Sequence, residues 1–208
     1  TPVPAVEEQA EKPVAVDTPV QPRRPRPGAG AQAVVGQEAG VDLHRLSIQT
    51  FAEADVDIVV DGKIDESLWQ TLPYYDNMLV SIPALVTPAE YATQIRIFAT
   101  EKGLYVSSDM EQPPDSLVKR YSRRDDFINR DTFGVTIDAS GEALVAYWFF
   151  IALGDSLSDG KVLPERRFQR DWDGPWLGKS AETDNGWSVE FFLPWSMMNM
   201  PEVDGPRT

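Results

Sequence analysis

The strongest constraint on the fold of this chain is a series of short segments in which apolar and polar residues alternate. In the clearest one, Phe133, Val135 and Ile137 fall on one face, with polar residues or glycine on the other. A period of two is typical of a β-strand with one buried face. Similar segments, or short apolar runs between turn residues, occupy 44–51, 57–62, 74–81, 93–99, 104–108, 132–138, 144–153, 180–183 and 187–193. So many strands at short spacing predict an all-β fold, an antiparallel β-sandwich of the jelly-roll or immunoglobulin-like kind.

Three segments between these strands do not follow the alternating pattern. Residues 65–69 are expected to form a short helix capped by Asp65. Residues 154–160 are bounded by glycines and predict a loop. The charged segment 161–170 fits neither a strand nor a helix pattern, so no element is predicted there.

The first 40 residues differ in composition from the rest of the chain. They hold seven of the 17 prolines and no aromatic residue, which predicts a disordered or extended, Pro-rich tether with acidic and basic residues. The folded domain is therefore expected to span 41–208. A polar ending, Gly205-Pro206-Arg207, follows the last strand pattern, which leaves open that the domain is truncated at its C-terminal side.

Charge and residue usage exclude several classes of function. The net charge is −14, which argues against nucleic acid and anionic lipid as partners, because both require a basic face. With no cysteine and only His44, the chain cannot form a disulfide, a thiolate site or a histidine cluster. The longest apolar run, 143–153, is too short for a membrane-spanning helix.

The most polar stretch lies just before the strand predicted at 132–138. Arg123, Arg124, Asp125 and Asp126 are consecutive, and a strand that begins at Thr132 would hold them at the rim of a sheet. Guanidinium and carboxylate groups offer forked donors and paired acceptors to a ligand rich in hydroxyl groups. The alternative is that these charges pair with one another and only keep the rim soluble.

Acidic loops provide a second candidate site. Asp171 and Asp173 flank Trp172, while Asp155 and Asp159 lie in the predicted loop 154–160. Carboxylates gathered in loops can bind calcium, a hard cation that prefers oxygen ligands. The sequence contains no EF-hand spacing, so the calcium hypothesis depends on how the fold arranges these four residues.

The order of several motifs resembles that of the family 9 carbohydrate-binding-module-like domains. The opening DGKIDESLW at 61–69 resembles the DG-x-(L/I)-DE-x-x-W start of that family. Further blocks follow in the family order: GLYV at 103–106, RDD at 124–126 with the strand to 138, WDGPW at 172–176, GWSVE at 186–190, and LPW at 193–195. Together they cover about 45–200. The most similar version stands at the N-terminus of bacterial outer-membrane proteins whose remainder is a predicted β-barrel.

The resemblance implies a β-sandwich that grips sugar ends between two tryptophans, helped by charged side chains, with structural calcium nearby. In this sequence Trp172 or Trp176 would be the stacking platform, and Arg124, Asp125 and Asp131 would bind hydroxyl groups. A flat aromatic ring covers the C–H face of a pyranose. The alternative is that both tryptophans pack in the interior, as Trp69, Trp187 and Trp195 are expected to do. Where the family usually carries an Asn-Pro pair, this sequence reads Ile151-Ala152-Leu153-Gly154.

The leading hypothesis is therefore a non-catalytic glycan-binding module, exported to the periplasm, outer membrane or cell surface. The alternative is a structural or interaction domain without a sugar site, packed on a membrane barrel or a partner protein. An enzyme would need a carboxylate pair such as Glu190 with Asp131 or Asp138, for which the sequence gives no suitable spacing. A haem site would need His44 and one methionine of 197–200, residues that more often serve in packing.

Overall fold

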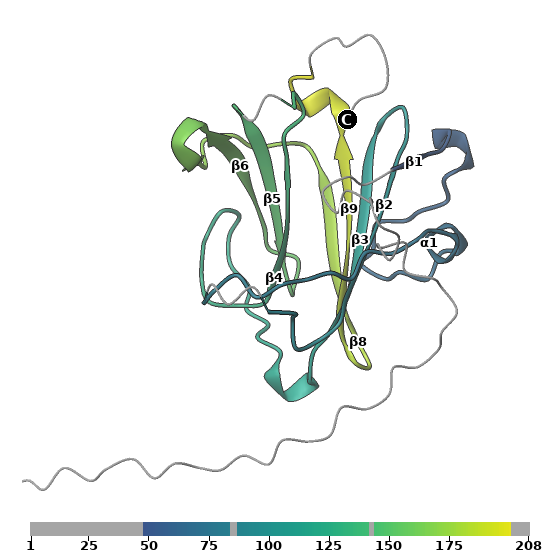
Figure 1. The fold of residues 1–208 in the computed structure, drawn as a ribbon, viewed down its shortest axis with the longest axis vertical. Coiled ribbons are helices and arrows are strands. Elements are labelled where there is room, and N and C mark those ends of the chain that lie inside the picture. Colours follow the sequence, from purple (N-terminus) through teal and green to yellow (C-terminus); the bar gives the residue numbers. More distant parts are fainter. Residues whose placement is uncertain (1–47, 84–86, 142–143, 201–208) are drawn as a thin grey trace, which may run out of the picture. The chain divides into compact units, whose positions relative to one another are not determined.

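The computed structural model describes residues 48–83, 87–141 and 144–200, which form two β-sheets (Figure 1). The first sheet has the strand order β1 (Gln49–Thr50), β2 (Thr93–Ala99), β3 (Gly103–Glu111), β9 (Gly186–Pro194) and β8 (Leu177–Thr183). The second has the order β4 (Thr132–Ile137), β5 (Ala146–Ala152), β6 (Leu157–Leu163) and β7 (Arg167–Gln169). All neighbouring strands are antiparallel except β1 and β2, which are parallel. The predicted antiparallel β-sandwich is confirmed.

Helical structure is confined to single turns among the described residues. The α-helix α1 spans Ser67–Thr71, and the 3₁₀ turns are η1 (Glu53–Asp55), η2 (Pro114–Ser116), η3 (Pro164–Arg166) and η4 (Trp195–Met197). The predictions for the tail at 1–40 and for His44 fall on residues outside the described part.

The main core lies between the two sheets. Apolar side chains of β5 and β9, such as Phe149 and Phe191, alternate inward and are fully buried. Trp176, just before β8, stacks on Phe191 with ring centroids 5.4 Å apart and meets Phe149 edge-on at 5.5 Å. Burial of such large rings is the main stabilising contribution of the sandwich.

A second apolar cluster covers the outer face of the five-stranded sheet. Phe98 of β2 and Tyr105 of β3 stack at 4.7 Å, and Trp69 of α1 meets Phe98 edge-on at 5.1 Å. Trp69 and Phe98 are fully buried. The segment 51–72, with α1 on the side of the sheet away from β5, therefore forms a lid over this outer face (Figure 1).

The lid is fastened by one buried carboxylate, Glu190 of β9. Its Oε2 accepts hydrogen bonds from the backbone N–H groups of Asp61 and Gly62, both at 2.9 Å, and its Oε1 accepts one from the indole of Trp69 at 2.8 Å. Gly62 has φ +91°, and a Cβ there would lie 2.6 Å from the carbonyl carbon of Ser180. The fold thus explains why Asp61-Gly62, Trp69 and Glu190 occur together.

Most strand predictions are confirmed, with boundaries shifted by a few residues. The hairpin of β2 and β3 and the strands β4, β5, β8 and β9 lie where the alternation placed them. The predicted burial of Trp69 and Trp187 is also confirmed, while Trp195 is partly buried against the core. The loop prediction for 154–160 was wrong after Ser156, because β6 begins at Leu157; the unassigned segment that follows contains the end of β6 and β7.

Three other local predictions were wrong. Residues 57–62 form no strand, because Ile58 packs on the second cluster as part of the lid. Residues 74–81 make only two isolated bridges, at Tyr75 and at Leu79. The N-cap of α1 is Glu66 and not Asp65, and it makes no side-chain capping bond.

Candidate functional site

The polar stretch of the sequence forms a loop that lies against the start of β6. Asp125 adopts a left-handed backbone conformation with φ 62°, which aspartate tolerates better than most residues. Its N–H donates to the carbonyl of Leu157 at 3.1 Å, and its carboxylate accepts the N–H of Asp159 at 3.1 Å. These two bonds attach the loop to the strand and bring the neighbouring Arg124 over Asp159.

Arg124 joins three segments of the chain. Its Nη2 donates to Asp159 Oδ1 at 2.5 Å and to the carbonyl of Gly174 at 3.2 Å, and its Nε donates to Asp173 Oδ1 at 3.1 Å. Asp159 is completely buried on the inward face of β6, and its Oδ2 accepts the N–H of Gly174 at 2.6 Å. The guanidinium therefore ties the loop to β6 and to the segment that leads into β8.

Burial dominates the protonation of Asp159. It raises the pKa of this carboxyl, although the N–H of Gly174 and the guanidinium of Arg124 both favour the ionised form. The buried indole N–H of Trp176 makes no hydrogen bond of good geometry, yet it lies close enough to Asp159 to contribute to lowering its pKa. The arrangement is a mostly satisfied polar network inside the edge of the sandwich.

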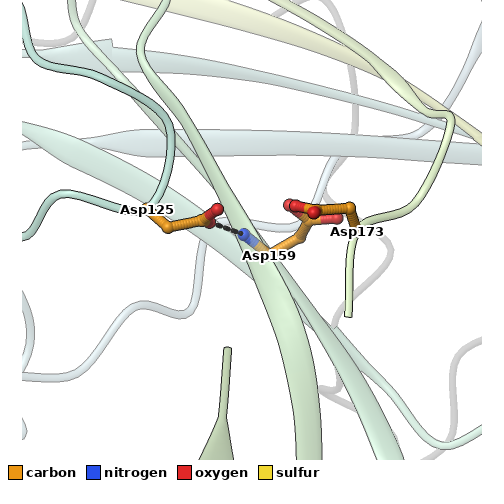
Figure 2. Close-up of side chains that lie close together, drawn as sticks. All are labelled: Asp125, Asp159 and Asp173. Carbon is orange, nitrogen blue, oxygen red and sulfur yellow. Dashed lines mark hydrogen bonds between the residues drawn. The ribbon is translucent and has the colours of Figure 1, made fainter. Parts of the chain in front are cut away.

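Three carboxylates of this network lie close enough together to suggest a cation site. Oxygen atoms of Asp125, Asp159 and Asp173 lie within 4.8 Å of one another (Figure 2). Arg124 lies among them, however, at 2.5 Å from Asp159 and 3.1 Å from Asp173, so a positive group already occupies the position that calcium would need. These residues, as arranged here, do not fit calcium, and calcium binding stays a prediction.

The remaining acidic residues of the predicted sites lie apart from this network. Asp131 accepts the N–H of Val118 at 2.7 Å and so ties together the two ends of the segment 118–131. Asp155 bonds the N–H and hydroxyl of Ser180 and the ammonium of Lys179, which lower its pKa against the opposing effect of burial. Asp171 is exposed. Of the four residues predicted as calcium ligands, the fold therefore brings together Asp159 and Asp173 but not Asp155 or Asp171.

The two tryptophans predicted as stacking platforms have different environments. Trp176 is 4% exposed and is covered by Phe149 and Phe191, so in this structure it packs in the core. Trp172 is partly exposed; its ring lies 4.9 Å from the ring of Tyr147. The ammonium of Lys161 lies over both rings, 5.4 Å from Tyr147 and 5.6 Å from Trp172.

An open cavity of about 360 Å³ is lined in part by Tyr147 and Lys161, the two residues that contact Trp172. It lies at the end of the four-stranded sheet where the β4–β5 connection, the end of β6 and the C-terminal segment meet. Its walls include the apolar side chains of Val145 and Leu163. Four other wall residues have groups that can form hydrogen bonds: Ser140, Tyr147, Lys161 and Asn199. The backbone N–H of Asn199 donates to the hydroxyl of Tyr147 at 3.0 Å, which fixes this ring in the wall. An apolar cavity with a few polar groups is the usual form of a small-ligand site.

The outer face of the four-stranded sheet carries a second aromatic surface. Trp148 of β5 is 1% exposed, and the rings of Phe127 and Phe168 lie 5.9 and 6.4 Å from it. These two phenylalanines are 51% and 61% exposed, and the guanidinium of Arg170 lies 3.9 Å from the ring of Phe127. Sequence reasoning missed this surface, although Trp148 and Phe150 on the second face of an already apolar strand were a signal that both faces are covered.

Two further hypotheses can be compared with the geometry. Both oxygens of Glu190 accept hydrogen bonds within the lid, on the opposite sheet from the strand that follows Asp131, so no glycosidase pair is formed by these two residues. Met198, considered as a haem ligand, is 6% exposed and belongs to the main core. In the described part of the chain, no helix has the length and apolar character needed to cross a membrane.

Comparison with known proteins gives structural relatives only. No family model and no curated protein matches the sequence. Among solved structures, a carbohydrate-binding protein candidate from Bacteroides uniformis aligns with a TM-score of 0.60, 13% identity, and coverage of 77% of this chain and 78% of that one. A family 9 carbohydrate-binding module from Caldicellulosiruptor kristjanssonii in complex with cellotriose gives 0.52, 12%, 72% and 67%, and one in complex with glucose gives 0.50, 12%, 74% and 70%.

These similarities confirm the predicted resemblance at the level of the fold. The described part of the chain has the β-sandwich of a carbohydrate-binding module of the family 9 type. Identities of 12–13% carry no information on which residues bind a ligand. Any ligand site must therefore be argued from the side chains of this chain.

Proposed function

We propose that this domain is a non-catalytic module that binds the end of a glycan chain in the cavity beside Tyr147 and Trp172. The observation that carries the proposal is an open cavity of about 360 Å³, two of whose lining residues, Tyr147 and Lys161, contact the partly exposed Trp172. This volume is at the small end of the range for ligand pockets, which suits a terminal sugar better than a long segment.

The chemistry of the cavity fits a sugar in two respects. Leu163 and Val145 provide apolar wall, and the partly exposed ring of Trp172, which packs against Tyr147, is a flat surface for the C–H face of a pyranose. The ammonium of Lys161 supplies donors for hydroxyl groups. The similarity in fold to modules crystallised with cellotriose and with glucose makes cello-oligosaccharides the first ligands to test.

Isothermal titration of the full chain with cellotriose and glucose, preceded by a glycan array, tests this proposal. We expect Trp172→Ala to weaken binding by about tenfold or more, because it removes an aromatic contact worth roughly 1 kcal/mol beyond its area. Trp172 also packs on the core, so Val145→Trp is the second variant: it fills the cavity without removing a core contact. Leu177→Ala, an exposed apolar position on β8, is the matched control. Absence of binding to any glycan on the array would remove the proposal.

The alternative function is an interaction domain without a sugar site. It is favoured by two of the residues expected to bind sugar: the donors of Arg124 are taken up by Asp159, Asp173 and Gly174, and Trp176 is buried. A negative glycan array together with capture of a defined membrane partner would support it.

The setting in which the module acts is part of the same proposal. The glycans of the cell envelope and of its surroundings lie outside the cytoplasm, so we place the module in the periplasm, at the outer membrane or at the cell surface. Fractionation of the producing cell, followed by detection of the chain with an antibody, tests this placement. Recovery in the cytoplasm alone would contradict it.

A further inference from the structure

The outer face of the four-stranded sheet presents exposed aromatic rings that no other described segment covers. The rings of Phe127 and Phe168 both contact the buried Trp148, and both are more than half exposed. Neighbouring Phe150 lies at 5.3 Å from Trp148 and extends the same surface. Exposed apolar groups of this kind, gathered on one face, usually mark a binding surface.

Two positions beneath the rings of Phe150 and Trp148 carry no side chain. A Cβ at Gly134 would lie 1.8 Å from two atoms of the Phe150 ring, and a Cβ at Gly160 would lie 2.6 Å from Trp148. Both rings can therefore lie directly on the backbone of the neighbouring strand. Thr132 and Thr136 of β4, which alternate with Gly134, are exposed on the same face and add hydroxyl groups.

The two segments that border this surface are basic, in contrast to the acidic chain as a whole. Segments 118–131 and 161–170 contain nine Lys and Arg residues and four Asp and Glu residues, a net charge of +5 in a chain of −14. Not all of these cations lie on the outer face: by the strand register, Lys161 and Arg167 alternate with the outward positions, and Arg124 pairs with Asp159 and Asp173. Arg170 lies against Phe127 and, within the described part of the chain, forms no ion pair with a carboxylate, so the face offers this cation to an anion.

Arg170 combines the aromatic and the cationic character of the surface. Its guanidinium carbon lies 3.9 Å from the centre of the Phe127 ring, a distance that indicates cation–π contact. Contact with a ring through the guanidinium face leaves the N–H donors at its edge free for a planar carboxylate, which they can bind in a bidentate manner.

From these contacts we infer that the outer face of the four-stranded sheet is a second ligand site, specific for acidic glycans that carry carboxylate groups, such as uronates. The C–H faces of the sugar rings pack on Phe168 and Phe127, the threonine hydroxyls bond ring hydroxyls, and Arg170 binds a carboxylate. An acidic peptide would also satisfy the charge, so its binding is one of the outcomes that the test below separates. This site shares none of its residues with the cavity at Tyr147 and Trp172.

The test is titration of the full chain with oligogalacturonate, with cellotriose, and with poly-glutamate of matched length. We expect oligogalacturonate binding that weakens as salt is raised. Arg170→Gln should weaken it by about tenfold or more, because a charge-assisted bidentate contact is lost. Phe168→Ala should also weaken it, and Trp172→Ala should not. Lys63→Gln, an exposed cation on the lid, is the matched control.

Three outcomes would overturn the inference. The first is absence of oligogalacturonate binding by a correctly folded chain, judged by circular dichroism. The second is binding of poly-glutamate as strong as that of oligogalacturonate, which would assign the face to acidic proteins. The third is binding lost in Trp172→Ala but unchanged in Arg170→Gln and Phe168→Ala, which would place the anionic sugar in the cavity. Cellotriose tests the cavity and oligogalacturonate tests the outer face. If only cellotriose fails to bind, the proposal for the cavity is wrong and the inference for the outer face is unaffected.

Discussion

The two outer faces of this sandwich are both aromatic, but only one is covered by a described segment of the chain. On the five-stranded sheet, Phe98 and Tyr105 lie under the lid formed by 51–72 and are buried. On the four-stranded sheet, Phe127 and Phe168 are exposed, and only Trp148 beneath them is buried. Aromatic residues on the second face of a strand therefore do not show by themselves whether the chain or a ligand covers them. What distinguishes the two faces is whether a segment of the described chain lies over the rings.

Removing one phenylalanine from each face tests most directly whether the two faces differ in their contribution to stability. Phe98→Ala should lower the free energy of unfolding by about 3–5 kcal/mol, because it opens a cavity under the lid. Phe168→Ala should change it by less than about 0.5 kcal/mol, because its ring is 61% exposed. Chemical denaturation of the two variants measures both values. Equal losses would mean that the two faces do not differ as described.

The carboxylate that fastens the lid gives the next largest effect and a dependence on pH. Burial raises the pKa of Glu190 from its ordinary 4.5 to about 7, despite three N–H donors that favour the ionised form. The folded state therefore holds this proton more tightly than the unfolded state. Its contribution is most favourable below pH 4.5 and is lost as the pH rises through 7. We expect a loss of about 3 kcal/mol across this window.

Denaturation at a series of pH values, compared with Glu190→Gln, isolates this contribution from those of other carboxyl groups. The variant should lack the slope between pH 4.5 and 7, whatever its absolute stability. Glu182→Gln, an exposed position on the adjacent strand β8, serves as the control and should keep the slope. An identical slope in wild type and Glu190→Gln would falsify the assignment.

A smaller loss of stability is expected at Gly160, where the ring of Trp148 lies directly on the backbone. Gly160→Ala places a Cβ 1.9 Å from the carbonyl oxygen of Gln169, a backbone atom of β7 that cannot move without breaking the strand pair. Overpacking of this kind costs about 1–3 kcal/mol. The variant should also lose oligogalacturonate binding through displacement of Phe168, while the lid stays intact. Hydrogen exchange of β7 and β2 amides would locate the change, and loss of protection in β2 would contradict it.

The sequence predicted strand positions best where a strand has one buried face and one exposed polar face. Phe133, Val135 and Ile137 gave β4 nearly to the residue. It was misleading at 57–62, where apolar side chains such as Ile58 are buried by lying over a sheet and not by pairing within one. Periodicity reports that one side of a segment is buried; it does not report whether the backbone is hydrogen-bonded to a neighbouring strand.

The candidate sites were only partly predictable for a related reason. Asp125 was predicted for a sugar site, and Asp159 and Asp173 for a calcium site; the fold brings all three together. In this arrangement they surround Arg124, which depends on a loop conformation at Asp125 that no spacing rule encodes. Phe168 was missed because it stands in a charged segment without a recognisable period.

The position of Glu190 also sets the order in which the domain can be completed during synthesis. Glu190 lies 129 residues after Asp61 and 121 after Trp69, the groups that it holds. During synthesis the lid segment is therefore made before the strand that holds it. Its hydrogen bonds to Glu190 cannot form until β9, the last strand of the described part, has been made and paired with β3. Until then Phe98 and Tyr105 have no complete sheet beneath them. The motif at 61–69 is thus made more than 100 residues before the strand that secures it.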